Sequence, residues 1–314
     1  MPARHKKIKK KTQRPSGRPP LAKEAIRGVK NKMKRENLLK AARDSDNIAA
    51  HRARAERSRM EAADPALKAE RLAKNVPTTI ESMRVYDETL GAEIEGGDED
   101  EFAGYFSDKI PPKVLITTSP HARHEAHELA EHLVGVVPNA EFVKRGTKFS
   151  VKEISQFCIN RAYTDLIVIS EDKKTVNGLT IVHLPEGPTM FFSLSSLRMP
   201  KQISGHGRAT QHVPELILNN FSTRLGATVG RLFQSLFPQT PEFVGRQVVT
   251  LHNQRDFIFF RRHRYIFKET ERVGLQELGP QFTLKLRRLQ RGIAQEMEWE
   301  HRSNMDKEKH KFYL

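Results

Sequence analysis

Apolar runs that suit buried strands begin abruptly at Lys113 of this 314-residue chain. Residues 113–119, KVLITTS, form the first short β-branched run of this kind. The first 60 residues contain few large apolar side chains and carry 20 Lys and Arg against 5 Asp and Glu. Because such a segment buries too little surface to offset its ordering entropy, we expect it to be disordered when alone. The ordered fold is therefore predicted to start at Lys113.

The N-terminal region, residues 1–75, is interpreted as a basic extension that is disordered or ordered by RNA. KKIKKK near its start has the composition of a nuclear import signal, and a later stretch combines helix formers with repeated arginines. Arg-rich segments of this kind often fold only against RNA. A solvated tail is the alternative, and both descriptions are compatible. The candidate RNA-binding residues of the extension are Lys9, Lys10, Lys11, Arg52 and Arg54.

An acidic linker is predicted at residues 76–112. Residues 61–110 carry 13 Asp and Glu against 5 Lys and Arg, and Pro111 and Pro112 close the acidic, glycine-containing run. A soluble spacer is the preferred interpretation of this segment, and restraint of non-specific RNA binding is the alternative.

Strand and helix patterns alternate after Lys113, which predicts an α/β fold. Up to about residue 200 the order is strand, helix, strand, helix, strand and hairpin. Ser150 and Glu153 have the spacing of a capping box, so a helix is expected to begin there.

A second α/β set follows a basic loop, KQISGHGRATQHVP. Residues 215–237 predict one amphipathic helix, and a series of antiparallel strands comes after it. The apolar stripe of that helix consists of Ile217, Phe221, Leu225, Val229 and Phe233. Residues 113–291 are therefore interpreted as two tandem halves, at about 113–200 and 213–291, followed by a C-terminal tail at 292–314.

The charge and the cysteine usage restrict the class of partner and compartment. A formal net charge of +16 favours an acidic polymer or an anionic surface as partner. A membrane is the weaker choice, because no apolar run approaches the ~18 residues of a spanning helix. The single cysteine, Cys158, excludes an internal disulfide framework and suits a reducing compartment. Its apolar helical neighbours favour a buried thiol over a nucleophile.

Motifs for catalysis or metal binding are not found in the sequence. His127 and His132 are five residues apart, which does not match the H-E-x-x-H spacing that places two imidazoles on one helix face. Gly205 and Gly207 make only a fragment of a dinucleotide fingerprint, and the chain has neither a P-loop nor a nucleophile elbow. We therefore predict no enzymatic activity, no cofactor and no metal site.

Basic and aromatic residues combine in DFIFFRRHRYIF, residues 256–267. Both faces of such a strand begin apolar, turn basic in the middle and end apolar. Cationic and aromatic side chains together suit RNA, which is held through its phosphates and by base stacking. A core strand with two solvated arginines is the alternative. Residues 281–290, QFTLKLRRLQ, predict a further strand whose polar face is cationic.

These two strands predict one cationic surface. If they pair antiparallel, their basic side chains form a continuous patch, which is costly unless RNA phosphate or an acidic partner neutralises it. The patch comprises Arg261, Arg262, Arg264, Lys285, Arg287 and Arg288. Together with the basic loop, the candidate RNA-binding residues of the folded region are Lys201, His206, Arg208, Arg255, Arg261, Arg262, His263, Arg264, Lys285, Arg287, Arg288 and Arg291.

Four segments resemble the Brix-domain family of ribosome assembly factors over about 200 residues, in the right order. They are KVLITTS, SGHGRATQHVPELILNNF, NQRDFIFFRRHRYIF and ELGPQFTLKLRRLQRG. KNVPTTIESMRVYDET and the ending EWEHRSNMDKEKHKFYL are similar to a branch of the family that serves the large ribosomal subunit. The last of the four segments corresponds to a sigma-factor-like RNA-binding motif of the family, and Gln281 stands where that motif commonly has a basic residue.

The resemblance implies two similar halves related to anticodon-binding domains and a non-enzymatic protein. It also implies binding to precursor rRNA of the large subunit in the nucleus and nucleolus, together with a dedicated assembly-factor protein partner and other factors of the large-subunit precursor. The alternative is a protein–protein scaffold in the pre-ribosome whose basic tails make only non-specific RNA contacts. No membrane and no small-molecule substrate are implied.

Overall fold

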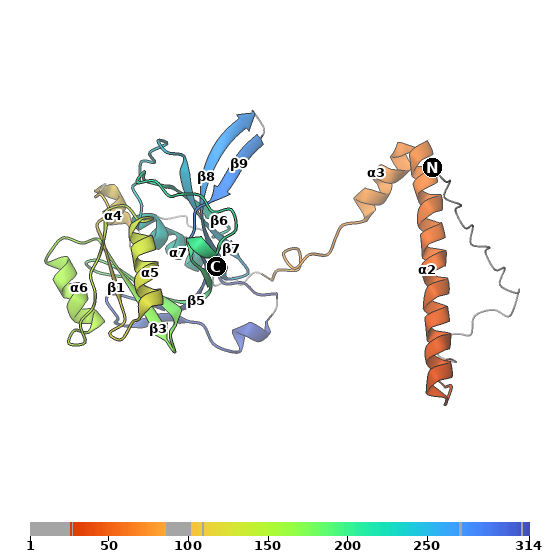
Figure 1. Ribbon diagram of the computed structural model, residues 1–314, viewed down its shortest axis with the longest axis horizontal. Helices are drawn as coiled ribbons and strands as arrows, with labels where there is room; N and C mark the ends of the chain where they lie inside the picture. The colour runs from red at the N-terminus through yellow and green to blue at the C-terminus, as the bar shows by residue number, and fades with distance from the viewer. Residues whose placement is uncertain (1–25, 27, 86–101, 109, 270–271, 309) are drawn as a thin grey trace, which may run out of the picture. The chain divides into compact units, whose positions relative to one another are not determined.

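The computed structural model describes residues 26, 28–85, 102–108, 110–269, 272–308 and 310–314 (Figure 1). The chain divides into two compact units, Met1–Thr78 and Thr79–Leu314. In the described part of the chain, no helix combines the length and the apolar character needed to cross a membrane.

The first unit is mainly helical where it is described. It contains α2, Lys32–Ala63, and α3, Pro65–Lys74. Asp64 separates them: it ends α2, and its side chain accepts from the backbone N–H of Ala66 at 2.9 Å to cap α3. Of the side chains of α2 only Ala42 is buried, so the helix depends on its helix-forming sequence and not on a core. The ordering of this segment by RNA stays a prediction.

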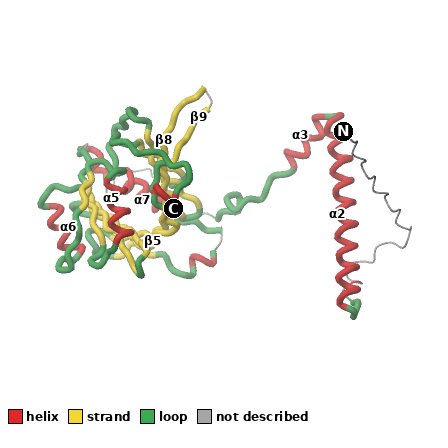
Figure 2. Tube along the Cα trace, in the orientation of Figure 1, coloured by secondary structure: helices red, strands yellow, loops and turns green. Residues whose placement is uncertain are grey.

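The second unit is built on one eleven-stranded sheet (Figures 1 and 2). The strands are β1 Val114–Thr118, β2 Ala140–Phe142, β3 Asp165–Asp172, β4 Thr175–His183, β5 Thr189–Arg198, β6 Glu215–Asn219, β7 Gln247–Gln254, β8 Phe257–Glu269, β9 Arg272–Glu277, β10 Gln281–Gln290 and β11 Met297–Glu300. Their order is β2-β1-β3-β4-β5-β10-β8-β7-β6, with β11 added to β10 and β9 added to β8. The helices are α4 Ala103–Ser107, α5 His124–Val134, α6 Val151–Ile159 and α7 Arg224–Ser235, with short 3₁₀ turns at Pro200–Gln202 and Met305–Lys307.

Strand directions repeat in the two halves of the sheet. In the first half β1 pairs parallel with β3, and β4 and β5 follow antiparallel. In the second half β6 pairs parallel with β7, and β8 and β10 follow antiparallel. The halves join through their last strands, because β5 pairs antiparallel with β10. The prediction of two tandem α/β halves is confirmed.

Helices cover the two faces of the sheet unequally. The apolar side chains of α5 and α7 pack with one face of both halves in a single large cluster. The apolar side chains of α6 pack with the other face of the first half, against Leu115, Leu166 and Val182. Cys158 of α6 is 1% exposed, which confirms the buried thiol, and burial raises its pKa to about 11.

The helix predicted at 215–237 is wrong in its first part. Glu215–Asn219 is strand β6, and α7 begins only at Arg224. Asn220 adopts a positive φ of 64°, which ends the strand, and the Thr223 hydroxyl accepts from the backbone N–H of Gly226 at 2.9 Å to cap the helix. A short apolar run fits a strand as well as a helix, and pairing with β7 decided between them.

The folded unit is wider than the region 113–291. Strand β11 pairs with β10, and Tyr313 and Leu314 are buried in the main core together with Phe102. The backbone N–H of Val85 donates to the carbonyl of His310 at 2.8 Å. Parts of the segments interpreted as an acidic linker and a C-terminal tail therefore belong to the fold.

Candidate nucleic-acid interface

The cations of β10 meet carboxylates from the C-terminal segment of the same unit. Lys285 Nζ lies 2.7 Å from Asp306 Oδ1, and its side chain is only 11% exposed. Arg288 Nε lies 3.2 Å from Glu300 Oε1. Directly after the strand, Arg291 Nε lies 4.0 Å from Glu298 Oε2. The positive charge of this strand is therefore largely neutralised within the protein.

The continuous patch predicted from β8 and β10 does not form. The two strands pair through their apolar parts, with Phe282 opposite Phe260 and Leu284 opposite Ile258. Because they run antiparallel, the basic residues that follow Phe260 and those that follow Leu284 extend in opposite directions. The prediction is wrong because the register could not be read from either strand alone.

Arg262, which the sequence placed among the RNA-binding candidates, is buried and hydrogen-bonded within the protein. It is 3% exposed, and its Nη2 donates to Gln247 Oε1 at 2.7 Å. Burial lowers its pKa to about 10. Gln247 Nε2 donates in turn to the carbonyl of Thr210 at 3.1 Å, so this buried arginine helps to hold the basic loop against the sheet.

The basic loop lies beside the β8–β9 hairpin. The backbone N–H of Gly207 donates to the carbonyl of Glu277 at the end of β9, at 2.8 Å. A Cβ on Gly207 would lie 2.8 Å from the end of the Gln276 side chain, so a larger residue here would require that flexible side chain to move. The predicted residues Lys201, His206 and Arg208 of this loop are all exposed.

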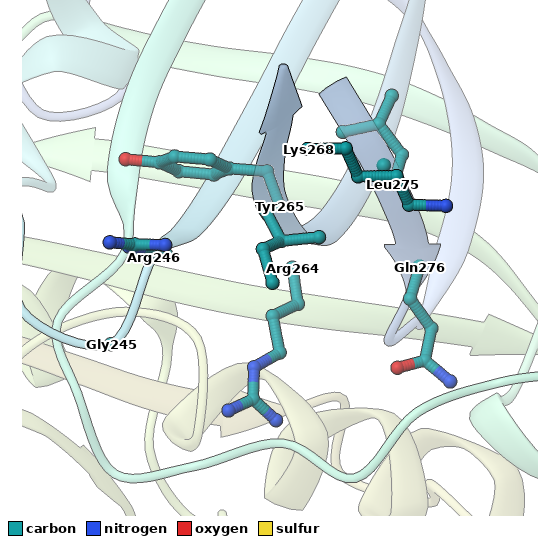
Figure 3. Close-up of a pocket in the computed structure, with 9 residues that line it drawn as sticks. Gly245, Arg246, Arg264, Tyr265, Lys268, Leu275 and Gln276 are labelled. Carbon is teal, nitrogen blue, oxygen red and sulfur yellow. The ribbon is translucent and has the colours of Figure 1, made fainter. Parts of the chain in front are cut away.

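A pocket of about 600 Å³ opens at the base of the same hairpin (Figure 3). Arg246, Arg264 and Lys268 line it together with Tyr265. None of these three cations forms an ion pair with a side chain in the described part of the chain, in contrast to the cations of β10. Arg264 was predicted from the sequence, but Arg246 and Lys268 were missed because neither lies in a basic run. We call His206, Arg208, Arg246, Arg264 and Lys268 the hairpin-base surface.

The two faces of the hairpin differ in charge. Arg264, Ile266 and Lys268 alternate with His263, Tyr265 and Phe267 along β8, as the sequence predicted for a strand. On the second face Arg261 Nε lies 4.0 Å from Glu277 Oε1, and partial burial lowers the pKa of His263. The cations available for phosphate are therefore concentrated on the face of Arg264.

Other predicted residues are dispersed. Arg255 is exposed in the turn between β7 and β8, and Arg287 Nε donates to Ser193 Oγ at 3.0 Å. Arg52 and Arg54 are exposed on α2 in the first unit, and Lys9, Lys10 and Lys11 lie outside the described residues. The structure does not gather these residues with the hairpin-base surface.

A buried Ser, His and Asp group ties the halves together and lacks the geometry of a catalytic triad. Asp165 Oδ1 lies 2.8 Å from His183 Nδ1, and the Ser235 hydroxyl donates to the same oxygen at 3.0 Å. The serine therefore contacts the carboxylate and not the imidazole. The rings of Phe102 and Tyr105 lie 4.8 and 5.0 Å from that of His183.

The known proteins that this chain resembles carry Brix-domain or ribosome-biogenesis names. Residues 119–288 match the Brix domain. Ribosome production factor 1 of Saccharomyces cerevisiae is 57% identical over 288 residues, which cover 91% of this chain and 97% of that protein. Ribosome production factor 1 of Mus musculus is 52% identical over 256 residues, which cover 77% of this chain and 72% of that protein. Among solved structures, a probable ribosomal biogenesis protein from Aeropyrum pernix K1 shares 15% identity with a TM-score of 0.43, covering 55% of this chain and 96% of that one.

The chain belongs to the Brix-domain family, as the resemblance predicted. Within that family its relatives are ribosome production factor 1 proteins, which supports a role in ribosome biogenesis.

Proposed function

We propose that the chain is a non-enzymatic assembly factor that binds precursor rRNA of the large ribosomal subunit in the nucleolus. The observation that carries the proposal is the hairpin-base surface, where several cations lie together without carboxylate partners among the described residues. Unpaired cations at one place are costly in the free protein, and phosphates neutralise them with release of counterions. The names of the relatives support ribosome biogenesis as the process.

Two further features support RNA as the ligand. Tyr265 lines the pocket beside the cations, which offers an aromatic edge next to phosphate contacts. Helix α2 carries nine Lys and Arg against five Asp and Glu, and nearly all of its side chains are exposed. We propose that this helix supplies a second, less specific RNA contact.

The salt dependence of RNA binding tests the proposal. The full chain and residues 79–314 are titrated with a short single-stranded oligouridylate at several salt concentrations. Each phosphate contact contributes about −0.7 to the log–log slope. Replacing Arg246, Arg264 and Lys268 together by Gln is expected to make the slope shallower by about 2 in both proteins.

A matched control uses cations that are already paired. Replacing Lys285, Arg288 and Arg291 by Gln removes the same charge, but these residues contact Asp306, Glu300 and Glu298. We expect a much smaller change of slope. Equal effects of the two triple substitutions would show that only net charge matters and would contradict the proposed surface.

The scaffold alternative is favoured by one observation, the exposed apolar side chains of β8 and β9. Phe267 and Leu275 are 63% and 64% exposed, and exposed apolar surface marks protein contacts. If residues 79–314 bind no RNA and only the full chain does, the basic extension accounts for the RNA contact and the scaffold describes the folded unit better.

A further inference from the structure

The loop between β2 and α6, residues 143–150, carries basic and aromatic side chains on the first half of the sheet. β2 is the last strand at this end of the sheet, so the loop follows a sheet edge and leads directly into the helix. Lys144, Lys148 and Lys152 are exposed, and none of the three forms an ion pair with a side chain in the part of the chain that the structure describes. Figure 1 shows α6 well apart from the β8–β9 hairpin, so this region is separate from the hairpin-base surface.

Two phenylalanine rings lie at the surface in the same region. Phe149 is 45% exposed and Phe157 is 41% exposed. Their ring centroids lie 5.4 Å apart at an interplanar angle of 86°, so the rings meet edge to face. Helix α6 packs on the sheet through other side chains, among them Ile154 and Cys158. Packing of the core therefore does not account for the two rings.

Two arginines hold the backbone that carries the rings. Arg145 Nε and Nη2 donate to the carbonyl of Phe149 at 3.1 and 2.8 Å, which closes the loop. At the end of α6, Arg161 Nη1 donates to the carbonyl of Phe157 at 3.1 Å. A surface that is already ordered in this way loses less conformational entropy when it binds a ligand.

The carboxylates nearest to the loop in the sequence are held by neutral donors. Glu153 Oε2 accepts from the backbone N–H of Ser150 at 2.7 Å and from its hydroxyl at 2.8 Å. The hydroxyl of Tyr163 donates to Glu141 Oε2 at 2.6 Å. The lysines of the loop thus differ from the cations of β10, whose charge is neutralised within the protein, and they favour an external anion.

We infer that this region binds unpaired RNA, with a base stacked on the rings of Phe149 and Phe157 and phosphates held by Lys148 and Lys152. Every base has a flat π-face, so an exposed aromatic ring can stack on unpaired bases while adjacent cations hold the backbone. Bases inside a duplex are already stacked on their neighbours and do not offer this contact. The site is distinct from the hairpin-base surface, and the inference rests on the proposed function only for RNA as the polymer.

An RNA ligand without bases separates stacking from charge. The full chain is titrated with a short oligoadenylate and with an abasic ribose-phosphate oligomer of the same length. Replacing Phe149 and Phe157 together by Leu is expected to weaken oligoadenylate binding at least about fivefold, because leucine offers no π-face. The affinity for the abasic oligomer should change by less than about twofold, and the log–log salt slope should stay the same with both ligands.

A matched control is a phenylalanine of equal exposure beside a cation that is already paired. Phe257 is also 41% exposed, and Lys285 Nζ lies 5.0 Å from its ring centroid, but that lysine contacts Asp306. Phe257→Leu is expected to leave oligoadenylate binding within about twofold of the unsubstituted chain. Circular dichroism of each variant checks that the fold is retained.

The phosphate contacts are tested without changing the rings. Replacing Lys148 and Lys152 together by Gln is expected to make the salt slope shallower by about 1.4 with both ligands, since each phosphate contact contributes about 0.7. Both lysines are exposed, so this variant keeps the core intact and decides the matter if the phenylalanine variant does not fold. An unchanged slope would overturn the inference.

Three results with the phenylalanine variant would also overturn it. These are unchanged oligoadenylate binding, an equal loss with both ligands, and loss of binding only to a glutamate-rich peptide that contains phenylalanine, which would assign the surface to an acidic protein segment. The Gln variant of Arg246, Arg264 and Lys268 distinguishes the two proposals. If that variant keeps the full salt slope, the proposed hairpin-base surface fails, whereas the base-dependent loss in the phenylalanine variant would remain.

Discussion

The guanidinium of Arg262 lies inside the second half of the sheet, where Gln247 Oε1 is its only hydrogen-bond acceptor among the described residues. Its Nε is buried and has no partner in the described part of the chain. An ion held in this way is stabilised by few contacts and destabilised by its loss of hydration. The sequence placed this arginine in a run of basic residues, and nothing in the run distinguished it from its exposed neighbours.

The acceptor on Gln247 is expected to matter more than the arginine itself. Gln247→Leu and Gln247→Glu both lose the hydrogen bond to Thr210, but only the leucine leaves the guanidinium without an acceptor. We expect Gln247→Leu to lower the free energy of unfolding by about 2 kcal/mol more than Gln247→Glu. Urea unfolding measures the difference.

The same comparison in an Arg262→Met background provides the control. There we expect the difference between leucine and glutamate at position 247 to disappear or reverse, because no buried cation needs the acceptor. An unchanged difference would mean that Gln247 acts through its other neighbours.

At the scale of elements, β10 and the C-terminal segment are held together by the pair of Lys285 and Asp306. The hydrogen bond from Lys285 holds the pKa of the Asp306 carboxyl below its ordinary value. A carboxyl with a depressed folded-state pKa contributes stability above its unfolded pKa and loses it as the pH falls through the folded pKa. The contribution is therefore present at pH 7 and disappears below about pH 4.

Asp306→Asn is expected to lower the free energy of unfolding at pH 7 by no more than about 1 kcal/mol, since the carboxylate is half exposed. The difference in free energy of unfolding between Asp306→Asn and the unsubstituted protein should shrink to zero as the pH falls below about 4. It should also decrease in high salt. Glu296→Gln, on the same segment and without an ion pair in the described residues, should show no such pH dependence. A deficit that persists at low pH would show that Asp306 acts through packing.

Local signals in the sequence predicted local structure well. Ser150 and Glu153 form the expected capping box, with the serine N–H donating to Glu153 Oε2 at 2.7 Å, and α6 begins directly after it. The alternation of β8 is also as predicted. Register, the strand β6 and the pairing of Lys285 with a residue 21 positions away depend on segments distant in the sequence, which no local pattern contains. The burial of Arg262 and the ion pair of Lys285 could not be predicted for the same reason, since exposure and pairing of a cation are tertiary properties.

At the scale of the whole molecule, the core of the second unit includes residues outside 113–291. Phe102, Tyr313 and Leu314 are 0%, 8% and 1% exposed. Burying each contributes about 1.5–3 kcal/mol, and a domain of this kind has a net stability of only about 5–15 kcal/mol. A fragment of residues 113–291 is therefore expected to show no cooperative unfolding transition, whereas residues 79–314 should show one. Thermal melts followed by circular dichroism decide this, and equal melting of both fragments would contradict the wider boundary.

The first unit is expected to be dispensable for folding and to strengthen association with RNA. Removing residues 1–78 should leave the melting temperature of the remaining unit within about 2 °C of the full chain, because the two units are separately compact. Sedimentation of cell extracts should show weaker association with large-subunit precursors, because the basic charge of α2 is lost. A removal that unfolds the second unit would show that the units stabilise each other.

The pairing of β5 with β10 makes the order of synthesis important. Strand β5 ends at Arg198 and β10 begins at Gln281, so the residue numbers differ by 83. At about 5–20 residues per second, a ribosome needs roughly 4–17 s to supply the second strand after the first. During that interval the nascent first half carries an unpaired strand edge, which is a site for misplaced pairing with other chains. A messenger truncated before residue 281 would therefore yield a product prone to aggregation, and a protein that assists ribosome construction would itself depend on nascent-chain chaperones.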